Sequence, residues 1–327
     1  MKSMNNISRM GLGCMGISYA YNTPVPDKEA KDFLAQAIDF GVDFFDTAII
    51  YGFGENERLL GEVVAEKGSR DKLFIASKCG LTVVGADGKE QRGINNDPAN
   101  MRKSCEQSLK RLKTDYIDLY YLHRWDRTTP MEVCIGTLAE LVKEGKIRAI
   151  GMSEVSAQTL RKACAVHPIA AVQSEYSLWT RDPEDGLLET CKELGVKFVA
   201  FSPMGRGFFS GSNIQPHTFS EGDLRRSMPR FCGDDFEKNK QILPAFYALA
   251  KEAGCSPSQL ALAWLLHRPY EVYLIPGTTK INHLKDNFGA KDVKLSKEII
   301  DKLEALINKG TVSGERYNAK ILAELDK

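Results

Sequence analysis

The sequence predicts an α/β protein, a (β/α)8 barrel of the TIM type, and three observations carry that prediction. Short apolar segments rich in Val, Ile and Phe recur along the 327 residues and alternate with amphipathic stretches of helical spacing. Eight such segments indicate a parallel sheet that closes on itself. The length matches the usual size of this barrel. No linker divides the sequence, so we expect residues 1–327 to form a single domain.

The strand candidates are continuous apolar runs, as expected for strands that are buried on both faces. The first is the early segment Ser8–Gly16. The others are Val42–Thr47, Leu73–Ser77, Ile117–Leu122, Ile147–Met152, Ala170–Gln173, Lys197–Phe201 and Val272–Ile275.

Apolar residues at helical spacing fill the stretches between these runs. Lys28–Phe40 is typical, with Asp27 as its expected N-cap. The other predicted helices are Met101–Leu112, Met131–Glu144, Ala157–Ala165, Gly186–Leu194, Lys238–Ala253, Ser258–Leu266 and Lys297–Ile307. Two connections, Gly80–Pro98 and Gly205–Asp235, are long, and such loops are often functional. The tail, Gly310–Lys327, either closes over the pocket or packs on the side of the barrel.

The composition limits the kinds of partner. Lys and Arg number 44 against 43 Asp and Glu, so no net field attracts nucleic acid or an anionic membrane. The eight cysteines contain no CxxC pair, which argues against a zinc site and suits a reducing compartment. No apolar run has the length of a signal peptide core or a membrane span. We therefore expect a cytoplasmic protein without a metal; its oligomeric state is left open.

Three glycines near the N-terminus, Gly11, Gly13 and Gly16, spell the GxGxxG pattern of a Rossmann phosphate loop. That motif must open a helix directly. Here the helical pattern begins only near Asp27. We therefore interpret these glycines as a glycine-rich end to the first strand.

Polar side chains follow the ends of the predicted strands. Asp46 ends the second strand, with Tyr51 in the loop after it, and Lys78 and His123 follow the third and fourth. In a barrel these positions share the C-terminal face, where active sites are built. Further polar strand ends are Ser153, Glu154, Gln173, Glu175, Ser202, Pro203 and the run Gly277, Thr278, Thr279 and Lys280.

Each of the first four residues also has a purely structural explanation. Asp46 can cap a loop, Lys78 can extend to solvent, His123 can be a hydrogen-bonded structural histidine, and Tyr51 can pack with its hydroxyl in water. These explanations weaken together, because four such residues converge on one rim. A shared site is the better interpretation.

These four side chains predict a general acid with electrostatic support. A tyrosine, with a pKa of about 10, is a poor acid at neutral pH, and a neighbouring ammonium group lowers that pKa. Asp46 can orient Lys78, and His123 can hydrogen-bond the substrate oxygen or relay the proton. Such a group suits protonation of a carbonyl oxygen as charge develops on it.

Several long stretches also carry a family resemblance. They are GVDFFDTAIIYGFGENERLLGE, FIASKCG, SLKRLKTDYIDLYYLHRWD, GKIRAIGMSEVS, VQSEYSLWTR, FSPMGRGFFSG and IPGTTKINHLKDN. In these stretches the chain resembles the aldo-keto reductases along nearly its whole length. The resemblance implies a barrel that binds NADP(H) without a Rossmann fold and reduces carbonyls to alcohols. It also implies that Asp46, Tyr51, Lys78 and His123 are the catalytic residues.

The resemblance implies a set of cofactor contacts as well. The carboxamide of the nicotinamide would contact Ser153, Gln173 and the residue directly after Ser153. That residue is often Asn in the family and is Glu154 here. Phe201 would stack on the nicotinamide, and Ser202–Gly207 would cover the pyrophosphate. The predicted contacts are Gly16, Asp46, Ser153, Gln173, Phe201, Ser202, Pro203, Met204, Gly205, Arg206, Gly207, Gly277, Thr278, Thr279, Lys280, His283 and Asn287.

Lys280 and the backbone amides at a helix start would bind a phosphate, which favours NADPH over NADH. His283 stands where many family members carry Arg, which softens that preference. The structural alternative is an ordinary helix start with Lys280 in water.

We therefore expect a reductase of small-molecule aldehydes or ketones that passes hydride from the nicotinamide to the carbonyl carbon and a proton from Tyr51 to the oxygen. One alternative is a cofactor-binding regulatory subunit of the same fold, as the potassium-channel β subunits are. Another is an NADP-dependent alcohol or sugar dehydrogenase that runs in reverse. The substrate is not predicted; the candidate pocket walls, which could equally be loop packing, are Tyr19, Phe53, Trp125, Trp179, Phe208, Phe209 and Phe231.

Overall fold

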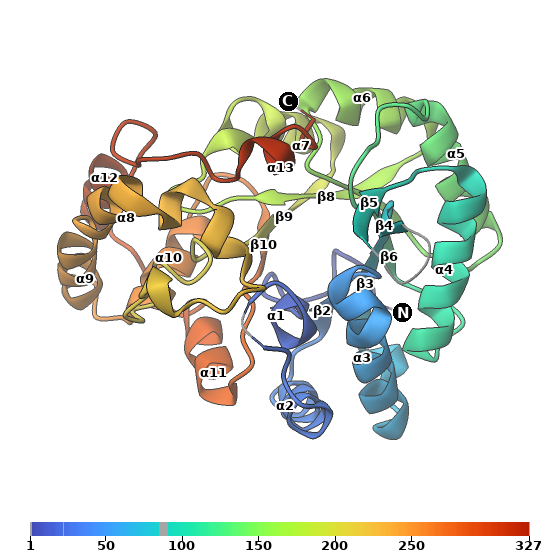
Figure 1. Cartoon of the computed structure of the whole chain (residues 1–327), viewed down its shortest axis with the longest axis horizontal. Helices are drawn as coiled ribbons and strands as arrows, with labels where there is room; N and C mark the ends of the chain where they lie inside the picture. Colours follow the sequence, from blue (N-terminus) through green and yellow to red (C-terminus); the bar gives the residue numbers. More distant parts are fainter. Residues whose placement is uncertain (1, 22, 85–90, 327) are drawn as a thin grey trace.

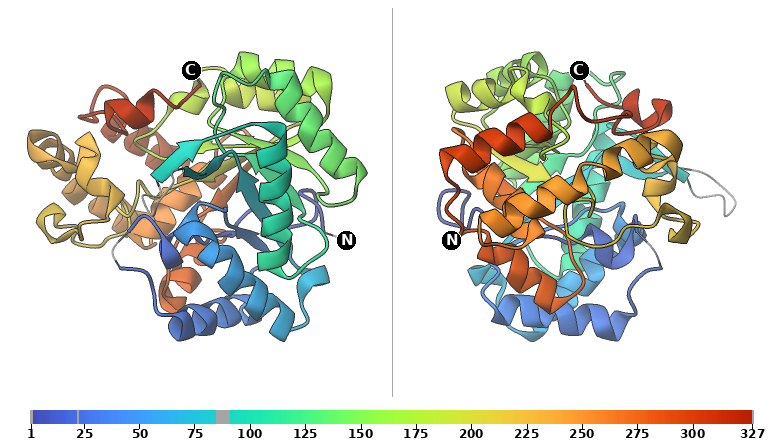
Figure 2. Two further views of the ribbon diagram at one scale, coloured as in Figure 1. Left: turned by 45° about the vertical axis from the view of Figure 1, so that its right-hand side comes forward. Right: turned by 90° about the vertical axis from the view of Figure 1, so that its left-hand side faces the viewer.

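Eight parallel strands form the centre of the molecule in the order β1-β2-β3-β6-β7-β8-β9-β10. The computed structural model describes residues 2–21, 23–84 and 91–326. Parallel bridges between Met10 and Leu274 and between Gly13 and Gly277 join the first strand to the last. Figures 1 and 2 show the helices outside and the strands inside. The predicted (β/α)8 barrel is confirmed.

The barrel strands coincide closely with the apolar runs of the sequence. They are β1 (Leu12–Gly13), β2 (Phe44–Asp46), β3 (Phe74–Cys79), β6 (Leu119–Leu122), β7 (Ile150–Ser153), β8 (Ile169–Glu175), β9 (Lys197–Phe201) and β10 (Val272–Ile275). The last two match the prediction residue for residue. All six residues of β3 are buried, including Lys78, because this strand is covered on both faces.

The helices surround the strands, and some of them begin at a residue whose side chain accepts from their free backbone N–H groups. Side chains of Asp97, Ser156, Ser256, Ser296 and Asn318 cap five of the helices in this way. The helices are α1 (Met15–Ser18), α2 (Asp27–Asp39), α3 (Glu55–Glu66), α4 (Pro98–Leu112), α5 (Met131–Lys143), α6 (Ala157–Val166), α7 (Leu187–Leu194), α8 (Gly233–Lys240), α9 (Leu243–Glu252), α10 (Pro257–Leu266), α11 (Ile281–Gly289), α12 (Lys297–Leu306) and α13 (Ala319–Leu322).

Some predicted helices differ from those observed. The stretch Lys238–Ala253 is two helices, because Pro244 in the first turn of α9 has no N–H to continue α8. Asp27 is the first residue of α2 rather than its N-cap. In that first turn its carboxylate complements the helix dipole. Helix α3 directly follows the Tyr51 turn and was not predicted.

The two long connections contain more structure than expected. In the first, β4 (Leu81–Val84) pairs antiparallel with β5 (Gln91–Ile94); residues 85–90 of that connection lie outside the described residues. The second contains three short 3-10 turns. Among the described residues, no helix is both long and apolar enough to span a membrane.

The sequence predicted that the GxGxxG glycines form the end of the first strand. Gly13 does end β1, whereas Gly16 lies beyond the strand. A Cβ atom on Gly13 would lie 2.7 Å from the carbonyl oxygen of Ile275, so this close approach of β1 to β10 requires glycine. Gly16 lies in the four-residue helix α1. No long helix begins at these residues.

Candidate active site

The four predicted catalytic residues lie together at the C-terminal ends of neighbouring strands. Asp46 ends β2, Lys78 lies near the end of β3, and His123 directly follows β6. Tyr51 begins the short 3-10 turn η1 (Tyr51–Gly54) after β2. Its ring meets His123 edge-on with 6.1 Å between centroids. The structure therefore brings all four side chains to one rim.

Lys78 is held by an ion pair inside the rim. Its Nζ contacts Asp46 Oδ1, donates to the carbonyl oxygen of Thr47 (2.9 Å) and lies 3.4 Å from Tyr51 Oη. Gln173 donates to the second Asp46 oxygen at 2.7 Å. Burial raises the pKa of Asp46 and lowers that of Lys78, and each charge opposes the shift of the other. The pair fixes the ammonium next to the phenol.

Tyr51 is a protonated acid in this environment. Burial raises its pKa well above the ordinary value, the Asp46 carboxylate raises it further, and the Arg124 guanidinium opposes the rise. We expected Lys78 to lower this pKa. The net shift has the opposite sign because the desolvation of a phenolate outweighs the neighbouring cations. Tyr51 therefore keeps its proton at neutral pH until an acceptor is bound.

His123 is neutral at physiological pH. Burial lowers its pKa well below the usual value, and the charges of Lys78 and Arg124 lower it further. Its Nδ1 atom is buried and has no hydrogen-bond partner among the described residues. A neutral imidazole suits the expected role of holding a carbonyl oxygen.

One cavity of about 550 Å³ connects this group with the helix start after β10. That volume lies within the usual range for small-molecule sites. The predicted site residues that line it are Gly16, Asp46, Tyr51, His123, Ser153, Gln173, Phe201, Ser202, Pro203, Met204, Arg206, Gly207, Gly277, Thr278, Thr279, Lys280, His283 and Asn287. Lys78 and Gly205 do not line it: Lys78 is fully buried, and Gly205 packs against the Trp179 ring.

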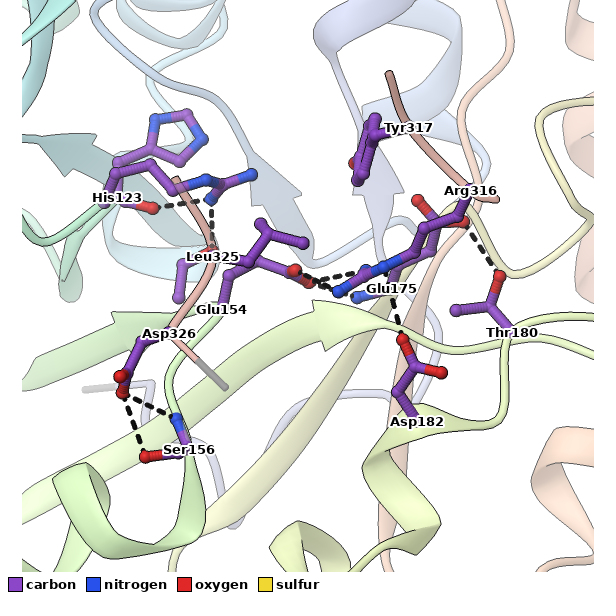
Figure 3. Close-up of polar contacts among 12 residues, drawn as sticks. His123, Glu154, Ser156, Glu175, Thr180, Asp182, Arg316, Tyr317, Leu325 and Asp326 are labelled. Carbon is purple, nitrogen blue, oxygen red and sulfur yellow. Dashed lines mark hydrogen bonds and ion pairs between the residues drawn. The ribbon is translucent and has the colours of Figure 1, made fainter. Parts of the chain in front are cut away.

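Glu154 cannot hold a carboxamide as its position implied. It does not line the cavity. Its Oε2 accepts from Arg316 at 2.7 Å, and its Oε1 accepts from the backbone N–H of Glu175 at 2.8 Å (Figure 3). Both carboxylate oxygens are occupied by the protein, so Ser153 and Gln173 remain the polar side chains for that role.

The C-terminal tail lies over the pocket. Tyr317 and Ile321 line the cavity, and the Tyr317 hydroxyl accepts from Arg206 at 2.5 Å. Farther along, the Asp326 carboxylate accepts from the N–H (2.9 Å) and the hydroxyl (3.0 Å) of Ser156 (Figure 3). Of the two placements that the sequence left open, the structure shows the one that covers the mouth.

The aromatic walls differ from those expected. Trp179, Phe208, Phe209 and Phe231 pack against one another in the core instead of lining the cavity, because each finds an apolar neighbour there. Phe53 is about half exposed, and Trp125 faces a separate surface hollow. The aromatic residues that line the cavity are Tyr19, Tyr21, Tyr51, Phe201 and Tyr317.

Sequence reasoning missed three arginines of the cavity, Arg92, Arg124 and Arg225. Arg124 immediately follows His123, so its place at a strand end could have drawn attention to it. Arg92 lies in the hairpin that was predicted as loop, and no pattern marked it.

The end of the cavity at α11 fits a phosphate-bearing ligand. Asn287 Nδ2 is buried there without a hydrogen-bond partner among the described residues. Lys280 forms no ion pair within the part of the chain that the structure describes. A free cation, an unpaired donor and the N-terminus of a helix are together suited to phosphate oxygens. The residues present therefore fit a nicotinamide dinucleotide.

The barrel and its rim of Asp, Tyr, Lys and His define an oxidoreductase that acts on carbonyl compounds. The chain belongs to the aldo/keto reductase family, whose family model matches residues 9–308.

The solved structures that are similar to the chain include the following three. A glycerol dehydrogenase from Gluconobacter oxydans is 31% identical over 92% of this chain and 91% of its own, with a TM-score of 0.82. A thermostable aldo-keto reductase solved with the inhibitor epalrestat is 32% identical over 92% and 95%, with a TM-score of 0.72. An aldo-keto reductase from Bacillus halodurans in its holo form is 25% identical over 95% of both chains, with a TM-score of 0.75.

Proposed function

We propose that the protein is an NADPH-dependent reductase of aldehydes or ketones. The observation that carries the proposal is one cavity that is lined by Tyr51 and also by Lys280 and Asn287. Among the described residues, Lys280 forms no ion pair and Asn287 Nδ2 has no hydrogen-bond partner. In this proposal the nicotinamide lies beside Tyr51 and the adenosine phosphate lies beside Lys280 and Asn287.

The bound nicotinamide would supply the hydride. Tyr51 donates its proton to the carbonyl oxygen, since burial keeps the hydroxyl protonated. Lys78, 3.4 Å from that hydroxyl, stabilises the phenolate that remains, while Asp46 and the Thr47 carbonyl hold the ammonium in place. His123, which is neutral, hydrogen-bonds the same carbonyl oxygen and orients it. Reduction of a carbonyl is accelerated by groups that stabilise the negative charge that develops on its oxygen.

Tyr51→Phe tests the proton donor. We expect kcat for aldehyde reduction to fall by about 100-fold or more, since a positioned general acid contributes about that much. The dissociation constant for NADPH, measured by fluorescence, should change little. Tyr19→Phe is the matched control, because its ring stacks on Tyr51 at 6.0 Å, and we expect a much smaller loss. Near-normal turnover in Tyr51→Phe would refute the assignment.

Lys280→Ala tests the phosphate contact. The variant should weaken NADPH binding by about tenfold and leave NADH binding nearly as it was, because only NADPH carries the extra phosphate. Lys285→Ala, an exposed lysine of the same helix outside the cavity, is the control. Equal weakening of both cofactors in Lys280→Ala would remove the proposed role.

The reverse reaction is a second candidate, because one similar structure is a glycerol dehydrogenase. The same residues would then accept a proton at Tyr51 while an alcohol is oxidised. Steady-state rates with aldehydes, ketones, sugars and polyols, each measured with NADPH or NADP⁺ and with NADH or NAD⁺, decide between the directions. A protein that binds the cofactor and turns over none of these compounds would instead favour a regulatory binding role.

A further inference from the structure

We infer that Arg124 binds an anionic group of the substrate, a carboxylate or a phosphate, an inference that rests on the reductase proposed above. Arg124 directly follows His123 at the end of β6 and lines the same cavity as Tyr51. Only 6% of the residue is exposed. The planar guanidinium presents paired N–H groups that match two oxygens of such an anion.

Arg124 forms no ion pair with any residue that the structure describes. Its Nη1 donates to two neutral acceptors, the carbonyl oxygen of His123 (2.6 Å) and the hydroxyl of Ser153 (3.2 Å). Its Nε is buried and has no hydrogen-bond partner, and no carboxylate of the described residues forms an ion pair with it. A buried charge without a partner is strongly unfavourable. A substrate anion would remove that penalty.

The other arginines that line the cavity each form an ion pair with a carboxylate. The pairs are Arg92 with Glu324, Arg206 with Glu175 and Arg225 with Asp223. Among the described residues, Arg124 is therefore the cavity arginine that lacks a carboxylate partner.

Arg124 also lies close to the chemistry. Its charge opposes the burial-driven rise in the pKa of Tyr51 and adds to the lowering of the His123 pKa, so the guanidinium is within electrostatic reach of both groups. An anion bound to Arg124 would therefore lie near the carbonyl that Tyr51 protonates. This arrangement favours small oxo acids and phosphorylated hydroxyaldehydes over neutral aldehydes.

The test compares each anionic substrate with a neutral match. We would measure kcat/KM for glyoxylate and its longer oxo-acid homologues against their methyl esters, and for glyceraldehyde 3-phosphate against glyceraldehyde. The anionic member should be preferred by the wild-type enzyme in the carboxylate or the phosphate series. Arg124→Gln should reduce that preference by about tenfold or more, and Arg124→Lys should keep part of it. The series that shows the effect identifies the anion.

A neutral double variant serves as the control. Arg92→Gln with Glu324→Gln removes a cavity arginine together with its counter-ion, so the net local charge is unchanged. We expect this variant to keep the preference. An equal loss in the double variant, or no preference in the wild-type enzyme, would overturn the inference. So would an Arg124→Gln variant whose NADPH dissociation constant rises as much as its KM, because Arg124 would then contact the cofactor.

A binding measurement separates this inference from the proposed function. Calorimetry would record the binding of succinate and of inorganic phosphate to wild-type protein and to Arg124→Gln, both saturated with NADP⁺. If no carbonyl is reduced but wild-type protein binds one of these anions and the variant does not, the anion site stands and the reductase proposal fails. If wild-type protein binds neither anion and reduces no anionic carbonyl, the inference fails.

Discussion

His123 is buried beside two cations, Lys78 and Arg124, and this environment excludes a further positive charge. The unfolded chain has no such constraint, so its histidine takes up a proton near the ordinary value of 6.5. As the pH falls below that value, the unfolded state binds more protons than the folded state does. The free energy of unfolding therefore decreases as the pH falls. The neutral imidazole that suits catalysis therefore makes the fold sensitive to acid.

His123→Gln should flatten that dependence. Between about pH 7 and pH 5 we expect the free energy of unfolding of the variant to fall by about 1–2 kcal/mol less than that of the wild-type protein. Urea denaturation at several pH values measures the difference. His217→Gln, an exposed histidine, should keep the wild-type slope. Parallel slopes for His123→Gln and the wild-type protein would contradict a depressed pKa at His123.

Single residues also show where sequence reasoning succeeds and where it stops. Asp46, Lys78 and His123 could be placed at one rim because each ends an apolar run, and the barrel brings those ends together. The contacts of Glu154 could not be predicted, because its partner, Arg316, lies 162 residues away and no local pattern connects them. The roles of the catalytic four remain predictions, although their proximity is now observed.

At the scale of elements, α4 ends in an unfavourable backbone conformation. Its C-cap, the exposed residue Lys113, has a φ of 51° in the left-handed region. A side chain in that region costs about 1–2 kcal/mol relative to glycine. Helix α3 ends with another exposed lysine, Lys67, whose φ of −82° is ordinary.

Lys113→Gly should therefore raise the free energy of unfolding by about 0.5–1 kcal/mol. Lys67→Gly should lower it, because glycine there adds only unfolded-state entropy and an exposed ion pair with Asp39 contributes little. Denaturant unfolding of both variants is the measurement. A change of the same sign in both would show that the backbone at Lys113 is not strained.

Helices and strands could be predicted where the pattern of apolar residues was unambiguous. Strands β9 and β10 match the prediction because their apolar runs have clear limits: Lys197 and Ser202 limit the first, and Glu271 and Pro276 limit the second. The hairpin β4–β5 was missed because its two strands are short and are separated by a polar stretch. Helices α8 and α9 were joined because the apolar spacing continues past Pro244, and only the missing N–H marks the break.

At the scale of the whole molecule, closure of the barrel depends on the close contact between β1 and β10. Gly13 allows that contact, since a Cβ atom would meet the Ile275 carbonyl at 2.7 Å. Both backbones are part of the sheet, so neither can move without disturbing its neighbours. A methyl group added at Gly13 would therefore disturb the packing of the whole barrel.

Gly13→Ala should therefore lower the free energy of unfolding by about 1–3 kcal/mol. Gly136→Ala is the matched control, because Gly136 lies within α5 with nothing near its missing Cβ. That change should stabilise the protein by about 0.5–1 kcal/mol. Thermal and denaturant unfolding record both. A neutral Gly13→Ala would show that the barrel closes by another route.

The tail that covers the cavity is made after the barrel that it covers. Translation delivers the eight strands and the four rim residues well before Tyr317, Ile321 and Asp326 leave the ribosome. A nascent chain can therefore close its barrel while the chamber above the rim still lacks a wall. The finished pocket, and any selectivity that depends on it, arises only after the segment that contains Tyr317 and Ile321 has been made.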